Sequence, residues 1–106
     1  MDVKRKLTLF NQNNSSLMRF SFNNQRMVRN YFKTINHRGL GDTANDLAIY
    51  GSKIYIVANV SSTIEIVDFQ TGNSLKQIQM LTENGNPREP RYIAFHKEKA
   101  YVCSYD

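Results

Sequence analysis

Three side chains in the sequence could bind a soft metal ion: His37, His96 and Cys103. Zinc sites in proteins usually place their ligands in pairs that are about two to five residues apart along the chain. None of the three has a partner at that spacing, so we predict neither a metal site nor a cofactor. The single cysteine rules out an internal disulfide bond, and the apolar run around it predicts a buried thiol.

Carboxylate, serine and histidine side chains raise the question of catalysis. Asp42 and Asp46 form the closest acidic pair of interest. Aspartates in such a polar loop commonly accept hydrogen bonds from nearby backbone N–H groups. The sequence also contains no nucleophile-elbow motif of the kind that presents a catalytic serine. We therefore predict that the protein is not an enzyme and has no catalytic residues.

The polar segment 39–46, Gly-Leu-Gly-Asp-Thr-Ala-Asn-Asp, leads directly into an apolar run. Loops that converge at the ends of strands commonly carry ligand sites. The segment and its repeat further along the chain predict a ligand-binding rim composed of Asp42, Asn45, Asp46, Arg91 and Tyr92. The alternative is that this loop packs one structural unit against the next, with its glycines permitting tight turns.

The elements expected to position these side chains are four short strands at residues 46–50, 53–59, 63–68 and 74–80. These runs are rich in β-branched and aromatic residues and are separated by turn residues, as in hairpins. Gly72 can adopt the positive φ of a tight turn, and Asp68 can accept hydrogen bonds within it. No stretch shows the periodicity of an amphipathic helix, so we expect residues 36–45 and 82–90 to be connections.

The chain contains an internal repeat. Residues 47–57 align without a gap on residues 93–103, a shift of 46 residues. Ala, Lys and Tyr recur at the same positions, and apolar positions recur as apolar. Periods of about 20–50 residues indicate a fold of stacked units, each of which buries its apolar surface against its neighbours.

A weaker copy of the unit lies upstream. Residues 6–10 and 15–17 match residues 53–57 and 62–64 at a shift of 47 residues. Because the two shifts nearly agree, we expect the same unit to occur three times, at least in part.

Both faces of the central unit are apolar. Strand alternation places Ile54 and Ile56 on one face and Tyr55 and Val57 on the other. A sheet that is apolar on both faces must be covered on both, as a blade of a β-propeller is by its two neighbours. We therefore predict an all-β fold of four-stranded antiparallel β-propeller blades.

The predicted organisation is a partial propeller of about two and a quarter blades over residues 1–106. Residues 1–35 form an incomplete first blade, and residues 36–80 form a complete blade with its leading loop. Residues 81–106 form a connection and the first two strands of a third blade. A toroid of four or more blades needs a longer chain, so we expect this one to be a fragment.

The central unit resembles a known repeat. It runs Lys-Ile-Tyr-Ile-Val-Ala-Asn at 53–59 and Ser-Thr-Ile-Glu-Ile-Val-Asp at 62–68, followed by Thr71, Gly72 and Ile78. This succession is similar to the YVTN-type repeat of the surface-layer, YncE-like β-propellers. The segments 39–46 and 90–95 also look like the bacterial cell-surface branch of that family.

The resemblance implies a seven-bladed toroid in the periplasm or at the cell surface that acts as a non-enzymatic ligand- or protein-binding scaffold. Some similar propellers capture corrinoids and pass them to an outer-membrane transporter, which makes cobalamin the first ligand to test and such a transporter a candidate partner. One alternative is a propeller enzyme, of lyase or quinoprotein type, with its active site on blades outside this chain. Another is a truncated fragment without independent function that self-associates through unpaired strand edges.

Composition narrows the classes of partner. The chain has 106 residues and a net charge of +5, with its only dense basic run at Lys4-Arg5-Lys6. Because the other positive charges are scattered, we predict no nucleic-acid partner. The apolar stretch 7–10 is far shorter than the core of a signal peptide, and no run reaches the ~20 apolar residues of a membrane span. We predict no export signal in this chain and no direct membrane insertion.

Overall fold

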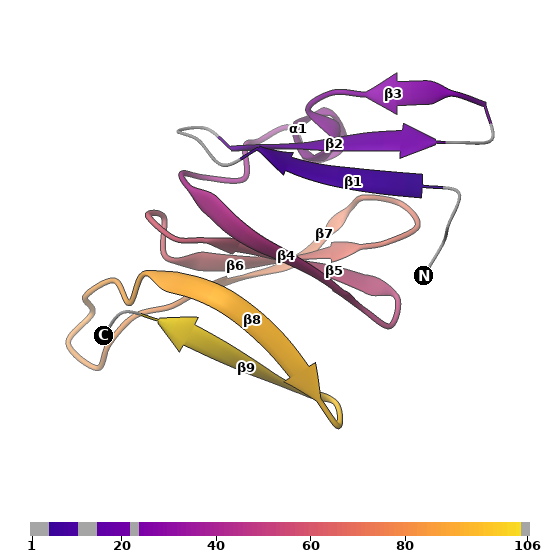
Figure 1. The fold of residues 1–106 in the computed structure, drawn as a ribbon. Helices are drawn as coiled ribbons and strands as arrows, with labels where there is room; N and C mark the ends of the chain where they lie inside the picture. Colours follow the sequence, from indigo (N-terminus) through magenta and orange to yellow (C-terminus); the bar gives the residue numbers. More distant parts are fainter. Residues whose placement is uncertain (1–4, 11–14, 22–23, 105–106) are drawn as a thin grey trace.

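The chain folds into three antiparallel β-sheets that follow one another along the sequence and stack face to face (Figure 1). The computed structural model describes residues 5–10, 15–21 and 24–104, so Lys4 of the basic run lies outside the described residues. The elements are β1 (Arg5–Phe10), β2 (Ser16–Ser21), β3 (Arg26–Val28), α1 (Tyr31–Asn36), β4 (Ala44–Tyr50), β5 (Lys53–Ala58), β6 (Thr63–Asp68), β7 (Ser74–Gln79), β8 (Pro90–His96) and β9 (Lys99–Ser104). The predicted all-β class is confirmed.

The middle sheet consists of β4 to β7 in chain order, which confirms the four strands predicted for the central unit. β4 begins two residues earlier than predicted, and β5 and β7 each end one residue earlier. The turn between β6 and β7 has the expected chemistry, because Gly72 has a φ of 79°. Asp68 Oδ2 accepts hydrogen bonds from the Thr71 backbone N–H (2.8 Å) and hydroxyl (2.9 Å).

The 46-residue repeat is reproduced pair by pair in the strand register. β4 pairs with β5 from Tyr50↔Lys53 to Ala44↔Ala58, and β8 pairs with β9 from His96↔Lys99 to Pro90↔Ser104. Both pairings carry an irregularity next to their last pair, again 46 residues apart. Such a bulge bends a strand locally and is a specific feature of a fold. The repeat in the sequence therefore corresponds to a repeat in the backbone.

Along β1, the alignment of the upstream copy in the structure differs by one residue from the predicted alignment. In the structure Leu7 and Leu9 face the middle sheet, as Tyr55 and Val57 face the β8–β9 hairpin. β1 thus corresponds to β5 at a shift of 48 residues, and the predicted shift of 47 is wrong for this strand. Strand side chains alternate between faces, so a slip of one residue exchanges the two faces, which a match of apolar residues alone does not detect.

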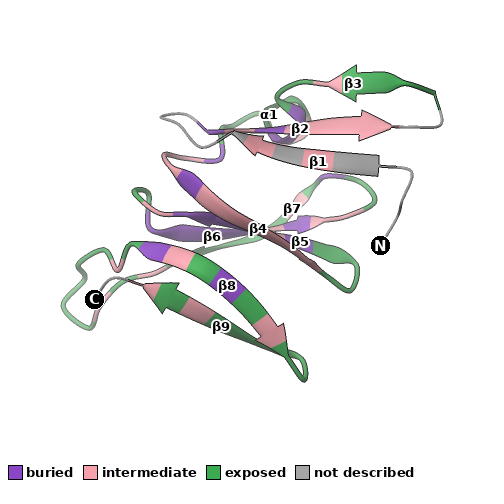
Figure 2. Ribbon diagram, viewed as in Figure 1, coloured by how far each residue is buried: buried purple, intermediate pink, exposed green. Residues whose placement is uncertain are grey.

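Both faces of the middle sheet are covered at β5 and β6 (Figure 2), as predicted, whereas β7 is mostly exposed. On one face Ile54 and Ile56 are buried in a cluster that includes Leu17 of β2 and Phe32 of α1. On the other face Val57 is buried with residues of β6 and β8. The middle sheet therefore lies between two separate apolar cores, and it shares one core with each neighbouring sheet.

A short helix, α1, follows β3, where the sequence predicted no helix. It spans Tyr31–Asn36, so the predicted boundary between residues 35 and 36 falls inside it. Six residues are fewer than the window in which helical periodicity can be recognised. Tyr31 and Phe32 bury the helix against the first core, and tertiary packing of this kind stabilises helices that are too short to form alone. No helix in the described ranges has the length and apolar character needed to span a membrane.

Cys103 is exposed, so the prediction of a buried thiol is wrong. The residue lies on β9 opposite Tyr92, and both side chains are on the outer face of the hairpin. Only the inner face of the hairpin packs against the middle sheet, through Ile93, Phe95 and Val102. An apolar sequence around a cysteine predicts a strand, but burial also requires a neighbour on that face.

Candidate functional site

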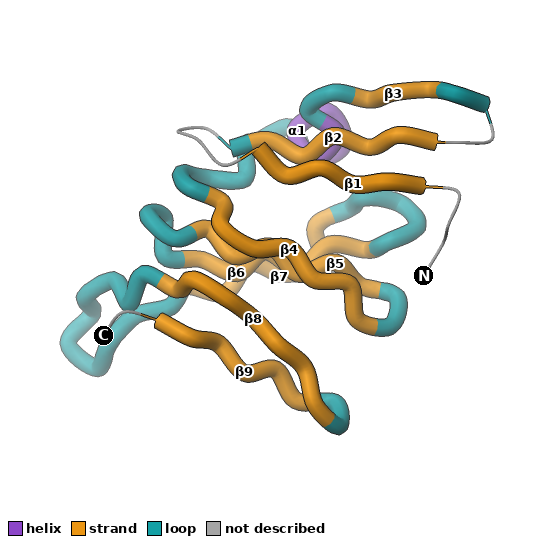
Figure 3. Tube along the Cα trace, viewed as in Figure 1, coloured by secondary structure: helices purple, strands orange, loops and turns teal. Residues whose placement is uncertain are grey.

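The loops at one end of the middle sheet and of the β8–β9 hairpin lie close together, on the left in Figure 3. The starts of β4 and β8 and the turn between β5 and β6 meet there. We call residues 41–45, 59–62 and 89–92 the loop end. All five residues predicted to bind a ligand lie on the loop end or directly beside it.

Asn59 connects the three segments of the loop end. Its backbone N–H donates to the carbonyl oxygen of Thr43 at 2.8 Å. Its side-chain Nδ2 donates to the carbonyl oxygens of Glu89 at 3.0 Å and Pro90 at 2.9 Å. One asparagine at the end of β5 thus holds the entry of β4 and the entry of β8.

Two buried serines make equivalent contacts in successive sheets. The Ser15 hydroxyl accepts a hydrogen bond from the backbone N–H of Ala44 at 2.8 Å. The Ser62 hydroxyl, 47 residues later, accepts from the backbone N–H groups of Arg88 at 3.0 Å and Glu89 at 3.2 Å. Each serine precedes a strand and binds the chain that enters the next sheet, so the connection between sheets repeats along with the strands.

Asn45 and Asp46 use their side chains to bind the hairpin. Asn45 Nδ2 donates to the carbonyl oxygen of Arg91 at 3.0 Å, and Asp46 Oδ2 accepts from the backbone N–H of Ile93 at 3.0 Å. The other oxygen of Asp46 accepts from the N–H of Leu47 at 2.9 Å. These contacts favour the alternative that was left open by the sequence, in which this segment packs one unit against the next.

Asp42 lies where the loop before β4 passes close to the turn between β5 and β6. Its backbone N–H donates to the Ser61 hydroxyl at 2.8 Å. The preceding residue, Gly41, has a φ of 105°, and a Cβ at that position would lie 2.7 Å from the same hydroxyl oxygen. Only glycine fits here without displacing Ser61, because an added side chain would meet both backbone strain and a clash.

Arg91 and Tyr92 differ from the other three predicted residues because Tyr92 projects outward. Its side chain is 53% exposed. The guanidinium carbon of Arg91 lies 5.5 Å from the centroid of the Tyr92 ring, within the range of a cation–π interaction. The predicted rim therefore has two parts. One part joins segments of the protein and consists of Asp42, Asn45 and Asp46. The other part is the Arg91–Tyr92 pair at the surface.

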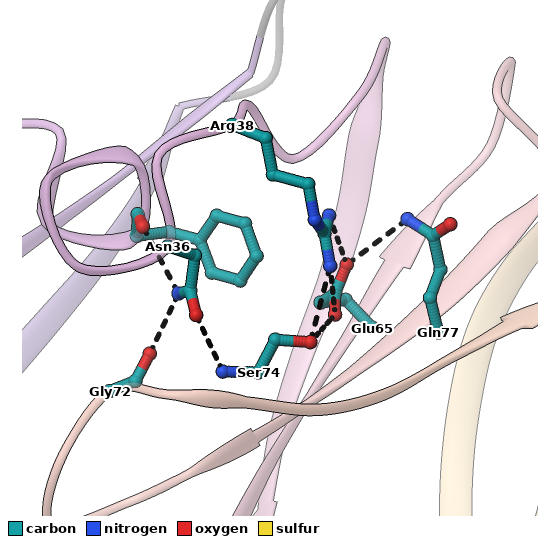
Figure 4. A network of polar contacts seen from close by, with 7 residues as sticks. Asn36, Arg38, Glu65, Gly72, Ser74 and Gln77 are labelled. Carbon is teal, nitrogen blue, oxygen red and sulfur yellow. Dashed lines mark hydrogen bonds and ion pairs between the residues drawn. The ribbon is translucent and has the colours of Figure 1, made fainter.

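A buried polar network around Glu65 was not predicted from the sequence (Figure 4). Glu65 is 1% exposed, and its two carboxylate oxygens accept from Arg38 Nη1 at 2.9 Å and Nη2 at 3.0 Å. Ser74 donates to the same carboxylate at 2.5 Å and Gln77 at 3.1 Å. The signal available in the sequence was a glutamate between Ile64 and Ile66, inside a largely apolar strand.

The Glu65 network joins the segment after α1 to the outer strands of the middle sheet. The hydrogen bonds that Arg38 donates to the Glu65 carboxylate raise the pKa of Arg38, partial burial opposes this, and the Coulombic attraction between the two charges adds to the increase. Asn36 extends the network, because its Oδ1 accepts from the backbone N–H of Ser74 at 2.7 Å and its Nδ2 donates to the carbonyl of Gly72 at 2.9 Å. Each carboxylate oxygen of Glu65 accepts two hydrogen bonds, so the side chain links these segments of the protein.

The described part of the chain contains no cluster of three or more His, Cys, Asp or Glu side chains that could hold a metal ion. His37 follows α1 and His96 ends β8, and both are exposed. The side chains at the surface of the loop end include the aromatic ring of Tyr92 and the guanidinium group of Arg91. No protein-family model and no curated protein matches the chain.

Proposed function

We propose that this chain is part of a β-propeller that serves as a non-enzymatic binding module. The main support is the repeated register of β4–β5 in β8–β9, including its irregularity. The stacking of each sheet on the next adds to it, because a propeller is made of four-stranded antiparallel sheets repeated around an axis. On this proposal the middle sheet is one complete blade, and the sheets on either side are parts of its neighbours.

The proposed binding surface is the loop end, with Arg91 and Tyr92 as its ligand-facing pair. An exposed aromatic ring beside a guanidinium offers a flat apolar surface and several N–H donors in one place. A flat, conjugated ligand with amide or carboxylate substituents would match both groups. Cobalamin has this chemistry, and the resemblance to corrinoid-capturing propellers makes it the first ligand to test.

The cellular setting of this module is proposed from the same resemblance. A propeller of the YVTN type would act in the periplasm or at the cell surface. Its partner would be an outer-membrane transporter that receives the captured ligand. Because the rigid sheets hold the loops in place, such a surface could bind without a large conformational change.

The test is a titration of the protein with cyanocobalamin, followed by isothermal calorimetry. We expect a Kd in the micromolar range, weakened about tenfold or more by Tyr92→Ala because an exposed aromatic anchor is removed. Leu75→Ala is the control, since Leu75 is a large apolar residue that is 52% exposed near the start of β7, away from the loop end. Absence of saturable binding would overturn the corrinoid proposal, and equal losses in both variants would overturn the assignment of the site.

A further inference from the structure

A cavity of about 310 Å³ lies between the first sheet and α1, away from the loop end. In Figure 1 this is the region where α1 lies beside β2 and β3. Its walls come from β2, β3, α1 and Asn24, which precedes β3. The lining residues are Arg19, Ser21, Asn24, Arg26, Val28, Tyr31, Thr34 and Ile35. A volume of this size is at the lower end of the range for small-molecule sites.

The strand register explains why these side chains share one space. Ser21 pairs with Arg26 and Arg19 pairs with Val28 across the antiparallel ladder. Residues directly opposite each other, and residues two apart on one strand, lie on the same face of a sheet. β2 and β3 therefore present two arginines and a serine to the same side, where α1 adds Thr34 and Tyr31.

The cavity is positively charged. Arg19 and Arg26 both line it, and no carboxylate is among its described lining residues. Two guanidinium groups on adjacent strands repel each other unless an anion lies between them, so their placement in one cavity favours an anionic ligand.

Arg19 is held in a fixed orientation by α1. Its guanidinium carbon lies 5.4 Å from the centroid of the Tyr31 ring, which is itself buried. Its Nε atom is buried and has no hydrogen-bond partner. Buried donors in native proteins are nearly always paired, so this donor is one that a bound water or a ligand oxygen could satisfy after a small movement of the side chain. A stacked and oriented guanidinium also loses little entropy when it binds an anion.

We propose that this cavity is a binding site for a small organic phosphate. The phosphate group would lie between Arg19 and Arg26, where its three oxygens can also accept hydrogen bonds from the hydroxyls of Ser21 and Thr34. The organic part would rest on Val28, Ile35 and Tyr31. A carboxylate has only two oxygens and one charge, so it satisfies this set of donors less completely. The proposal does not depend on the function proposed for the loop end.

The test is calorimetric titration of the protein with phenyl phosphate at low ionic strength. We expect saturable binding with a Kd below a millimolar, and benzoate and the neutral benzyl alcohol should each bind at least tenfold more weakly. Arg19→Gln and Arg26→Gln should each weaken the binding of phenyl phosphate about tenfold or more, because each removes a charged pair of donors. Arg29→Gln is the control, since it makes the same change of charge at an exposed residue that does not line the cavity.

The variants separate a site from a general attraction to positive charge. Loss of affinity in Arg26→Gln but not in Arg29→Gln supports the proposal, and Arg26 is exposed enough that its replacement should leave the fold intact, as circular dichroism would verify. Equal losses in Arg26→Gln and Arg29→Gln would overturn it. So would the absence of saturable binding to the wild-type protein, or equal affinities for phenyl phosphate and benzoate.

Discussion

The middle sheet and the β8–β9 hairpin carry the same repeat and the same register, yet they differ in burial (Figure 2). Val57 is 0% exposed, whereas Cys103, its equivalent 46 residues later, is exposed. Tyr55 is half-buried against the second core, whereas its equivalent Tyr101 lies open on the outer face. Equivalent residues on equivalent strands thus have different surroundings.

The difference shows that burial in this molecule depends on what stacks against a sheet. The middle sheet has a neighbour on each face, so β5 and β6 bury residues at both odd and even positions. In the described structure the hairpin packs on one side only, and its outer face carries Tyr92, Tyr101 and Cys103.

The largest effect is expected from Arg38→Gln, which removes the charge partner of Glu65. A buried carboxylate that loses its partner is strongly destabilising, so the free energy of unfolding should fall by about 3 kcal/mol. This is the lower end of the usual range, because Arg38 is 44% exposed and Ser74 and Gln77 remain bonded. Urea denaturation measures the change.

The double variant Arg38→Gln/Glu65→Gln is the control for that experiment. Replacing the carboxylate by a neutral amide removes the unpaired charge, so about half or more of the lost stability should return. If the double variant is no more stable than Arg38→Gln, the buried charge is not the cause of the loss.

The next largest effect is expected from shortening a valine to alanine, and this change can be compared at a fully buried and a half-buried site. Val57→Ala removes two methyl groups from a fully buried site, which costs about 2 kcal/mol from transfer and cavity terms. Val102→Ala makes the identical change at a half-buried site of the hairpin and should cost less than about 1 kcal/mol. Equal changes in the free energy of unfolding would contradict the difference between the two regions.

A smaller and more local effect is expected from Asn59→Ala. It deletes the two side-chain hydrogen bonds that hold the start of β8, each of which contributes about 1 kcal/mol. Hydrogen exchange of the β8 and β9 amides should therefore become about thirtyfold faster, with little change in β5 and β6. Asn73→Ala, at an exposed turn of the middle sheet, is the control. Uniform acceleration in all strands would show that the hairpin is not a separate unit of stability.

The smallest effect should come from Asp68, which acts within its own turn. Hydrogen bonds from the backbone N–H and the hydroxyl of Thr71 lower its pKa in the folded state. The stabilisation is therefore complete above the unfolded pKa of about 3.9 and is lost as the pH falls through the lower folded value. The Tm of Asp68→Asn should drop less than that of the wild type between pH 6 and pH 3. Glu83→Gln, at an exposed residue, should behave as the wild type; if Asp68→Asn does so too, the turn contributes no pH dependence.

Much of the backbone was predictable because its determinants are local. Alternating apolar residues predicted β4 to β7 to within two residues, and Gly72 with Asp68 predicted the turn between β6 and β7. The 46-residue repeat predicted that β8 and β9 copy β4 and β5. The helix α1 was missed because it is too short for its periodicity to be recognised, and the shift along β1 was misjudged by one residue.

By itself the sequence determined the strands, their turns, the repeat and the two apolar faces of the central unit, because these follow from backbone preferences and side-chain alternation within a few residues. Only the tertiary structure decided the partners of the polar side chains. Asn45, Asp46 and Asn59 bind groups about 30 to 47 residues away, and Glu65 binds Arg38 across 27 residues. Hydrogen-bond partners and burial depend on which surfaces meet, and that depends on how the sheets stack.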